Sequence, residues 1–342
     1  MAPGAHTVLD VAADQEGHGG GSTFTVVLAL LVNLGIAAMK AVAGAITGSA
    51  ALLAEAAHSV ADTFTEVLLL TALRRSARPA DVRHPFGYGK ERYFWSLMAA
   101  VSIFASGAVF AFLQGIEALT GERTEQLRPT VGYVVLALAF AMEIVSWRRA
   151  IRQVRTEAAA EGRRPREYLR YSDDPTVRTV LLEDSAALIG LLLAFAGVGL
   201  HHLTGSAVWD GLASIAIAVL LAVVAYSLGR TNKRLLIGQQ ADPNLVRAVY
   251  RWLREQPEVT AVVDLLTMVT GTDHVLLCAR VDFDDALGVA ELERTCVRLA
   301  SDLTEEFAEL DEIFLEPVPR TDQELRARVL ARYGDVFRRG HE

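Results

Sequence analysis

His58 and Asp62 stand four residues apart in an otherwise apolar run that includes residues 50–62. On a helix, this spacing places both side chains on one face, one turn apart. An imidazole and a carboxylate within hydrocarbon are costly and usually have a function. Together they supply half of a tetrahedral site for a borderline divalent cation such as Zn²⁺. The rest of the chain must then provide the other half of the site and a path to it.

A second pair of acidic residues, Glu183 and Asp184, lies near one end of another apolar segment. Adjacent side chains on a helix point about 100° apart. We therefore expect one of the two to face His58 and Asp62, and the other to act as a supporting group or proton acceptor. Small residues surround both pairs, which allows the two helices to approach closely.

Other ionisable residues inside the apolar segments have simpler explanations. Lys40 could neutralise one of the carboxylates. Glu66 and Asp210 lie within reach of segment ends, where snorkelling or a hydrogen bond between helices would satisfy them. Glu143 precedes a basic stretch, and we expect it to pair with an arginine at 148–149.

The composition indicates a membrane protein. The 342 residues are 52% hydrophobic and 22% charged, which is more apolar than an ordinary soluble domain. A membrane-spanning helix needs about 20 mainly apolar residues. Six segments satisfy this: 24–46, 50–73, 94–119, 131–151, 177–203 and 207–228. The sequence thus predicts an α-helical transport domain of six transmembrane helices over residues 23–231.

The basic residues indicate how these helices are oriented. Lys and Arg gather in the segments that follow the second, fourth and sixth spans, whereas the opposite side has only Arg123 and Arg128. Basic loops stay in the cytoplasm. We therefore expect a multi-pass protein of the cell (inner) membrane with both termini cytoplasmic. We interpret residues 1–22, which have no Lys or Arg, as a disordered tail rather than a signal sequence.

Residues 239–320 read as a soluble domain with alternating helix and strand patterns. The expected elements are a helix over 242–256, strands over 259–270 and 274–284, a helix over 289–307 and a strand over 311–316. This α-β-β-α-β order fits a small open-faced, ferredoxin-like or metallochaperone-like sandwich. Its core is small, so pairing with a second copy is expected. Residues 321–342 read as a charged tail.

Charge and cysteine content exclude other roles. The net charge of −8 argues against a nucleic-acid partner. Cys278 and Cys296 form no CxxC pair, so we expect buried, reduced thiols. The soft metal ligands of the soluble domain are these two cysteines and His274, and we expect the domain to dimerise without bound metal.

Four features together resemble the cation diffusion facilitator family of metal/proton antiporters. They are the six spans, the run from Gly48 to Asp62, the loop His84-Pro-Phe-Gly-Tyr-Gly-Lys-Glu-Arg92, and the α-β-β-α-β tail. The resemblance covers roughly residues 23–318. It implies a homodimer in the lipid bilayer that exports a divalent cation, usually Zn²⁺, from the cytoplasm in exchange for protons. Mn²⁺, Fe²⁺, Co²⁺ and Cd²⁺ are alternative cargoes, and no further cofactor is implied.

The resemblance also implies a ligand set. The family site takes two ligands from the second span, which His58 and Asp62 match, and two from the fifth. In the fifth span, the usual pattern is His or Asp, then three other residues, then Asp. Here Glu183 and Ala187 stand at these two positions, as in a sub-branch with Glu-Asp-Ser/Thr-Ala-Ala. Asp184 or a water would fill the fourth position.

The resemblance extends to a second, loop site. Asp81 and His84 match a family metal site in the loop after the second span, in which Tyr88 replaces a later His.

An intramembrane metalloenzyme would use the same ligands in a different way. No HExxH motif occurs in any span, and no residue stands out as a general base beside an open metal position. The sequence therefore favours a secondary transporter over an enzyme.

Overall fold

The structure is a computed structural model that describes residues 21–121, 129–160, 162–171 and 175–333. Most of the expected N-terminal tail and the end of the C-terminal tail lie outside these ranges. The chain divides into two compact units. The first takes in residues up to 71 with 95–165 and 176–230, and the second takes in 72–94, 166–175 and 231 onward.

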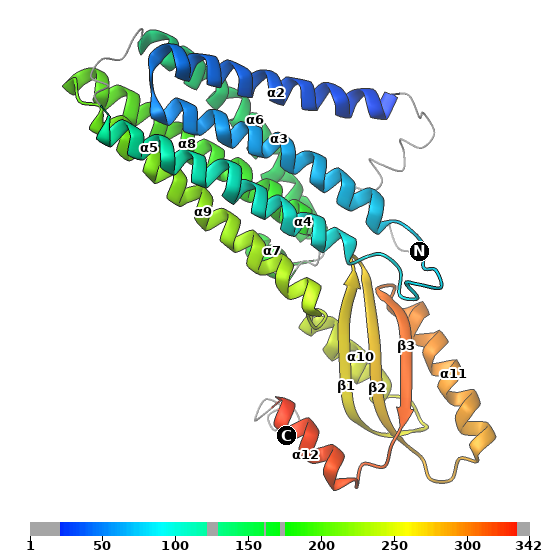
Figure 1. Cartoon of the computed structure of the whole chain (residues 1–342). Helices are drawn as coiled ribbons and strands as arrows, with labels where there is room; N and C mark the ends of the chain where they lie inside the picture. Colours follow the sequence, from blue (N-terminus) through cyan, green and yellow to red (C-terminus); the bar gives the residue numbers. More distant parts are fainter. Residues whose placement is uncertain (1–20, 122–128, 161, 172–174, 334–342) are drawn as a thin grey trace. The chain divides into compact units, whose positions relative to one another are not determined.

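Long helices form the first unit (Figure 1). They are α2 (Gly21–Thr47), α3 (Ala50–Ser76), α4 (Glu91–Ser102), α5 (Val109–Thr120), α6 (Pro129–Ala160), α8 (Pro175–Thr204) and α9 (Val208–Ile237). A π-helical turn, Ile103–Ala108, joins α4 to α5 in one rod, and the short α7 spans Pro165–Tyr171.

Four of the described rods are long and apolar enough to cross a membrane: 91–120, 129–160, 175–204 and 208–237. The helix α3 has 27 residues but carries several ionisable groups, and in α2 the described apolar stretch is Asn33–Thr47. Both helices exist as expected, whereas their role as the first two of six spans stays a prediction.

Two helices extend beyond the predicted spans. The helix α6 continues to Ala160 and α9 to Ile237, beyond the expected ends at 151 and 228. The residues added to α6 are mostly Arg, Gln, Glu and Ala, which are good helix formers. Much of the basic stretch expected as a loop is therefore helix.

The turn between α2 and α3 is fixed by Gly48 and by a buried acid. Gly48 has φ of +70°, a left-handed conformation that glycine adopts at little cost. Asp210 of α9 accepts hydrogen bonds from Ser49 Oγ at 2.7 Å and from the Ala50 backbone N–H at 2.5 Å. The hydrogen bond between helices expected for Asp210 is thus confirmed.

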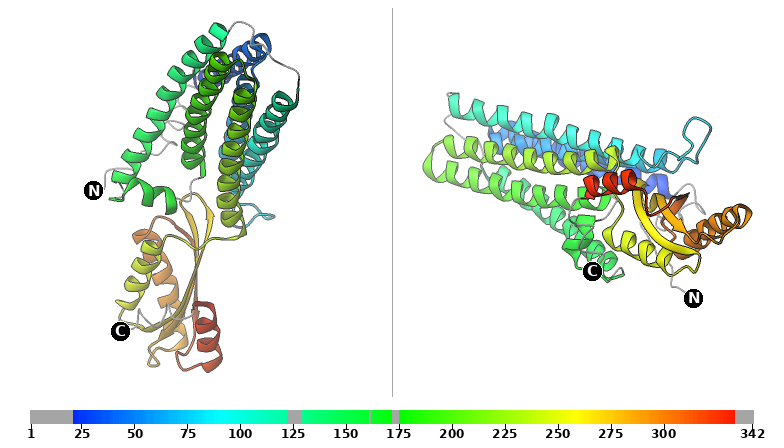
Figure 2. Two further views of the ribbon diagram at one scale, coloured as in Figure 1. Left: turned by 90° about the vertical axis from the view of Figure 1, so that its left-hand side faces the viewer. Right: turned by 90° about the horizontal axis from the view of Figure 1, so that it is seen from below.

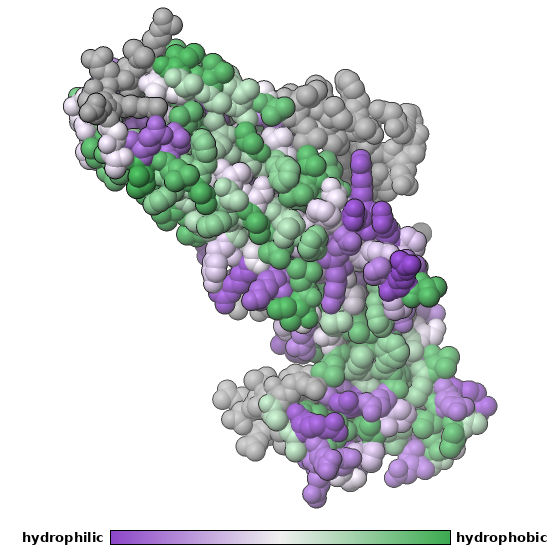
Figure 3. Space-filling view, in the orientation of Figure 1, coloured by the Kyte–Doolittle hydropathy of each residue, from purple (hydrophilic) through white to green (hydrophobic). Residues whose placement is uncertain are grey.

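Small side chains fill the core of the first unit, and large apolar ones face outward. Ala51, Ala54, Ala139 and Ala194 are fully buried, so the helices pack closely. Phe64 and other large apolar side chains are exposed on the helices, where green residues dominate in Figure 3. An apolar exterior over small-residue contacts is what a bilayer requires of a helical bundle.

The second unit contains the expected α-β-β-α-β fold. Its elements are α10 (Pro243–Arg254), β1 (Val259–Gly271), β2 (His274–Phe283), α11 (Val289–Glu306) and β3 (Leu310–Pro317). The strand order is β1-β2-β3, with β1 antiparallel and β3 parallel to β2. The helices α10 and α11 pack on one face of the sheet, and α12 (Gln323–Tyr333) lies toward the other (Figure 2).

The other sheet face carries an ion-pair network across all three strands. Arg280 of β2 pairs with Asp264 of β1 at 3.1 Å and with Glu316 of β3 at 2.7 Å. Cys278 lies on the same strand face, and both it and Cys296 are free and half-buried. Burial raises the pKa of each thiol, so both stay protonated near neutral pH.

Candidate metal centre

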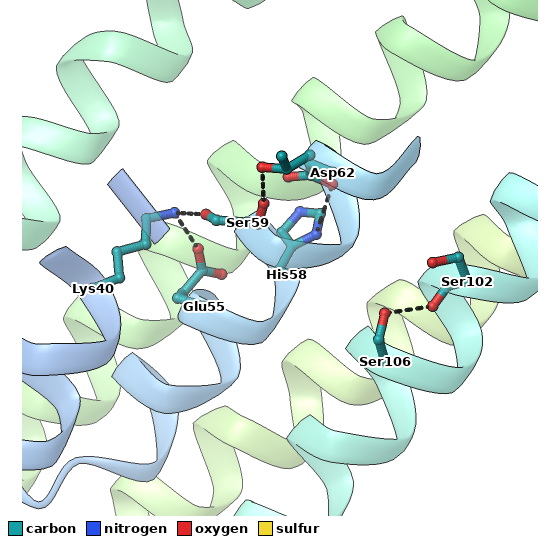
Figure 4. A network of polar contacts seen from close by, with 8 residues as sticks. Lys40, Glu55, His58, Ser59, Asp62, Ser102 and Ser106 are labelled. Atoms are coloured by element: carbon teal, nitrogen blue, oxygen red, sulfur yellow. Dashed lines mark hydrogen bonds and ion pairs between the residues drawn. The ribbon is translucent and has the colours of Figure 1, made fainter. Parts of the chain in front are cut away.

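The expected pair, His58 and Asp62, lies on one face of α3 (Figure 4). His58 Nδ1 is 3.2 Å from Asp62 Oδ1. The His58 side chain is 1% exposed and that of Asp62 is 24% exposed. Among the described residues, neither ring nitrogen of His58 has a hydrogen-bond partner, so Nδ1 is within ion-pair distance of Asp62 without a well-formed hydrogen bond. A carboxylate beside one ring nitrogen leaves the other available as a lone-pair donor, which is the usual arrangement of a metal-binding histidine.

A buried ion pair joins α2 to α3 about one turn before His58. Lys40 Nζ of α2 donates to Glu55 Oε2 at 3.3 Å and to Ser59 Oγ at 2.8 Å (Figure 4). Both charged side chains are 0% exposed. The possibility that Lys40 neutralises a carboxylate is confirmed, and that carboxylate is Glu55.

Glu55 also sets how α3 meets α8. A Cβ atom at Gly190 would overlap with Glu55 Oε1, so the absent side chain admits the carboxylate. Further along α8, Val198 and Leu52 of α3 both lie beside Gly132, since a Cβ there would be 3.8 Å from Val198 Cγ1 and 3.1 Å from Leu52 Cδ1. Residue numbers thus rise along α3 as they fall along α8, and Asp62, seven residues after Glu55, is level with Glu183, seven residues before Gly190. The two helices therefore run antiparallel, with Asp62 facing Glu183. Glu183 is 8% exposed, and its Oε1 has no hydrogen-bond partner among the described residues.

Asp184 is held by a different helix. Its Oδ2 accepts a hydrogen bond from Ser146 Oγ of α6 at 2.9 Å. Next to it, Trp147 Nε1 of α6 donates to Ser185 Oγ at 3.0 Å. Adjacent acids thus divide as their helical spacing predicts: Glu183 faces the α3 pair, and Asp184 faces α6.

The predicted ligands are near one another without forming a closed shell. In the described part of the chain, no three His, Cys, Asp or Glu side chains are grouped so as to hold an ion. The assignment of His58, Asp62, Glu183 and Asp184 as ligands therefore stays a prediction. Small rotations of side chains on α3, α6 and α8 would be needed to close a site around a cation.

Two further carboxylates, those of Glu66 and Glu143, lie near this centre. Glu66 accepts a hydrogen bond from Asn33 Nδ2 of α2 at 2.6 Å, which confirms the expected contact between helices. Glu143 differs from its expectation: in the described ranges it has no ion pair with Arg148 or Arg149. Sequence periodicity gave no signal for this, because the helix rotation that turns Glu143 toward the centre comes from packing.

The loop residues Asp81 and His84 form a compact polar turn in the second unit. Asp81 Oδ1 accepts from the backbone N–H groups of Arg83 and His84 at 2.8 Å and 2.7 Å, and lies 3.3 Å from His84 Nδ1. Tyr88, which replaces the expected His, donates its hydroxyl to Asp81 Oδ2 at 2.8 Å. The Tyr88 hydroxyl and the backbone N–H groups hold the pKa of Asp81 below its usual value.

The same loop and the sheet enclose a cavity of about 300 Å³ within the second unit. Gly89 packs against the hairpin, since a Cβ there would be 2.5 Å from the Thr270 carbonyl oxygen. The far wall includes His274, whose Nδ1 is 2.5 Å from Asp311 Oδ2. His274, at the start of β2, thus joins β2 to β3.

Comparison with known proteins identifies the class. Residues 26–237 match the cation efflux transmembrane domain. The chain therefore belongs to the cation efflux family, whose members are transporters rather than enzymes.

Individual relatives point in the same direction. The chain is 35% identical, over 76% of its length, to a mitochondrial protein of Xenopus laevis named proton-coupled zinc antiporter SLC30A9. It is 32% identical over 84% of its length to metal tolerance protein C4 of Arabidopsis thaliana. It is 24% identical over 82% of its length to the cation-efflux pump FieF of Shewanella oneidensis. The matches cover 46%, 61% and 90% of those proteins, so the chain spans only part of the first two.

Proposed function

We propose that this protein is a secondary transporter that moves a divalent cation, foremost Zn²⁺, across a membrane in exchange for protons. The observation that carries the proposal is the His58–Asp62 pair, whose imidazole is buried and has no hydrogen-bond partner among the described residues, with Glu183 opposite. Imidazole and carboxylate ligands suit Zn²⁺. The relatives named as zinc antiporter and cation-efflux pump support the same class of cargo.

Exchange with protons follows from the ligand chemistry. An imidazole and carboxylates bind a cation only when deprotonated, so metal and protons compete for the same atoms. A site that faces the cytoplasm takes up metal and releases protons, and a site that faces the other side does the reverse. Lys40 and Glu55 add no net charge to the site, and ionised Asp62 and Glu183 attract a divalent ion.

The proposed topology places six spans in a cell membrane, with α2 and α3 joining the four apolar rods and both termini in the cytoplasm. The soluble fold pairs with that of a second copy to make a homodimer. Asp81 and His84 are proposed as a secondary cation site in the cytoplasmic loop, with Asp184 a supporting group at the main one.

Reconstitution into proteoliposomes tests this function. A zinc-sensitive dye and a pH-sensitive dye are sealed inside, and Zn²⁺ is added outside. We expect zinc entry with simultaneous proton exit, and stimulation by a proton gradient of the matching direction. Zinc entry that is unaffected when a protonophore collapses the gradient would contradict antiport. Absence of flux for Zn²⁺, Mn²⁺, Fe²⁺, Co²⁺ and Cd²⁺ alike would contradict transport itself.

A further inference from the structure

A tetrahedral cation site needs about four ligands, and α3 with α8 offers three that face one another. They are His58, Asp62 and Glu183. The fourth predicted ligand, Asp184, is engaged by Ser146 on α6. The position on α8 three residues before Gly190 is Ala187, which is 2% exposed and has no ligand atom. A ligand from another helix would complete the set.

The helix α6 runs antiparallel to α8, and their contacts fix its register. A Cβ at Gly132 would lie 3.8 Å from Val198 Cγ1 near one end. Further along, Ser146 Oγ is 2.9 Å from Asp184 Oδ2. Residue numbers therefore rise along α6 as they fall along α8. Glu143, three residues before Ser146 on α6, is therefore level with Ala187, three residues after Asp184 on α8.

Helix α3 reaches the same level by an independent contact. Glu55 lies against Gly190, and the two helices are antiparallel. His58, three residues after Glu55, is therefore level with Ala187, three residues before Gly190. Glu143 and His58 thus occupy the same layer of the bundle, on two helices that both contact α8.

Glu143 faces inward in that layer. It lies three residues before Ser146 and four before Trp147, which both bond to α8, and residues at these spacings share a helix face. The charged groups that act on its carboxyl come from α2, α3 and α8: Lys40, His58, Asp62 and Asp184. In the described ranges Glu143 has no hydrogen bond or ion pair, and Lys40 is already engaged by Glu55 and Ser59.

We propose that the Glu143 carboxylate of α6 is the fourth ligand of the transported cation, in the place that Ala187 cannot fill. The other three are His58, Asp62 and Glu183. This inference rests on the proposed transport function, since it completes the same site. The buried, unpartnered Nε2 of His58 is the independent sign that this layer awaits a ligand. Three helices then close on the ion, and binding draws α6 toward α3.

Equilibrium binding to the full-length protein in detergent tests the proposal. Zn²⁺ is titrated against a chromophoric chelator, and Co²⁺ serves as a spectroscopic probe of ligand number. Glu143→Gln is expected to weaken Zn²⁺ binding by about 100-fold or more, beyond the roughly 10–100-fold typical of groups that only orient a ligand. It should also change the Co²⁺ absorption bands. The matched control is Glu157→Gln on the same helix, where Gln153 holds the carboxylate, and it should bind as wild type.

A second variant moves the ligand back to α8. Adding Ala187→Asp to Glu143→Gln returns a carboxylate to the same layer and should recover at least tenfold of the lost affinity. If Glu143→Gln does not fold, Glu143→Asp replaces it and should weaken binding and shift the Co²⁺ bands, because its shorter arm displaces the carboxylate.

The outcomes separate this inference from the transport function. Wild-type Zn²⁺ binding in Glu143→Gln, or a loss below about 100-fold with unchanged Co²⁺ bands, overturns the fourth ligand while the transporter stands. Failure of the wild-type protein to bind Zn²⁺ or Co²⁺ overturns the proposed function together with it.

Discussion

Breaking the buried ion pair between Lys40 and Glu55 should destabilise the protein strongly. Both side chains are 0% exposed and their charged atoms are 3.3 Å apart, so water cannot replace a lost partner. Removing one member of such a pair costs about 3–5 kcal/mol, because the other charge stays buried. We therefore expect Lys40→Met to lower the free energy of unfolding by about 3–5 kcal/mol.

The double variant Lys40→Met/Glu55→Gln isolates the charge. It removes both members, and replacing a buried pair by uncharged groups of similar volume is often close to neutral. We expect it to recover about half of the loss or more, with the coupling obtained from a double-mutant cycle. The assay is denaturation of the purified protein from detergent micelles with increasing SDS, followed by circular dichroism. The control is Lys233→Met at an exposed lysine.

Two results would contradict the stabilising role of this ion pair. Lys40→Met within about 1 kcal/mol of wild type would show that the pair contributes no more than an exposed one. A double variant as unstable as the single one would show that packing, rather than charge, holds α2 to α3.

Three further predictions follow from single contacts. Gly190→Ala should cost about 1–3 kcal/mol in the same SDS titration, because the added Cβ overlaps with a buried carboxylate; unchanged stability would contradict the register of α3 and α8. Tyr88→Phe should raise the pKa of Asp81 toward its usual value. The pKa of Asp81 is depressed in the folded protein, so ionised Asp81 orders the loop fully at pH values above its pKa in the unfolded chain. This order is lost as the pH falls through the pKa of Asp81 in the folded protein. In Tyr88→Phe the loss should therefore begin at higher pH; carbon-13 NMR of the labelled carboxyl measures this, and an unchanged titration would contradict it. Arg280→Met should destabilise the three-stranded sheet by about 1.5–3 kcal/mol in thermal unfolding of the full chain, as expected for lost charge-assisted hydrogen bonds, and an unchanged melting temperature would count against it.

The sequence predicted the features that depend on local spacing. The four-residue interval places His58 and Asp62 on one face of α3 wherever that helix lies, and their 3.2 Å contact follows. The adjacent acids 183 and 184 had to diverge, and they do. The strands and helices of the soluble fold are predicted correctly because each one depends on a single spacing of apolar residues along the chain.

Features that depend on how helices are rotated against each other could not be predicted from the sequence. Lys40 pairs with Glu55, and the missing side chain of Gly190 on another helix leaves room for that carboxylate. Glu143 turns inward because Ser146 and Trp147 bond to α8, a contact that no periodicity within α6 encodes.

The positions of helix ends could not be predicted for a different reason. Hydrophobicity marks where a chain can meet lipid, whereas helix propensity decides where the helix stops. The two coincide at Thr47, where Gly48 follows. They separate at the end of α6, where charged helix formers carry the helix on to Ala160.

Zinc flux through a single variant tests the proposed transport site most directly. Asp62→Ala keeps the helix and its small-residue packing but removes the carboxylate that holds His58 and faces Glu183. In proteoliposomes with matched protein content, we expect this variant to lose Zn²⁺ transport and the accompanying proton flux, as should His58→Ala and Glu183→Ala, while Asp184→Ala is affected less. Wild-type Zn²⁺ flux in Asp62→Ala would contradict the assignment of this centre as the transport site.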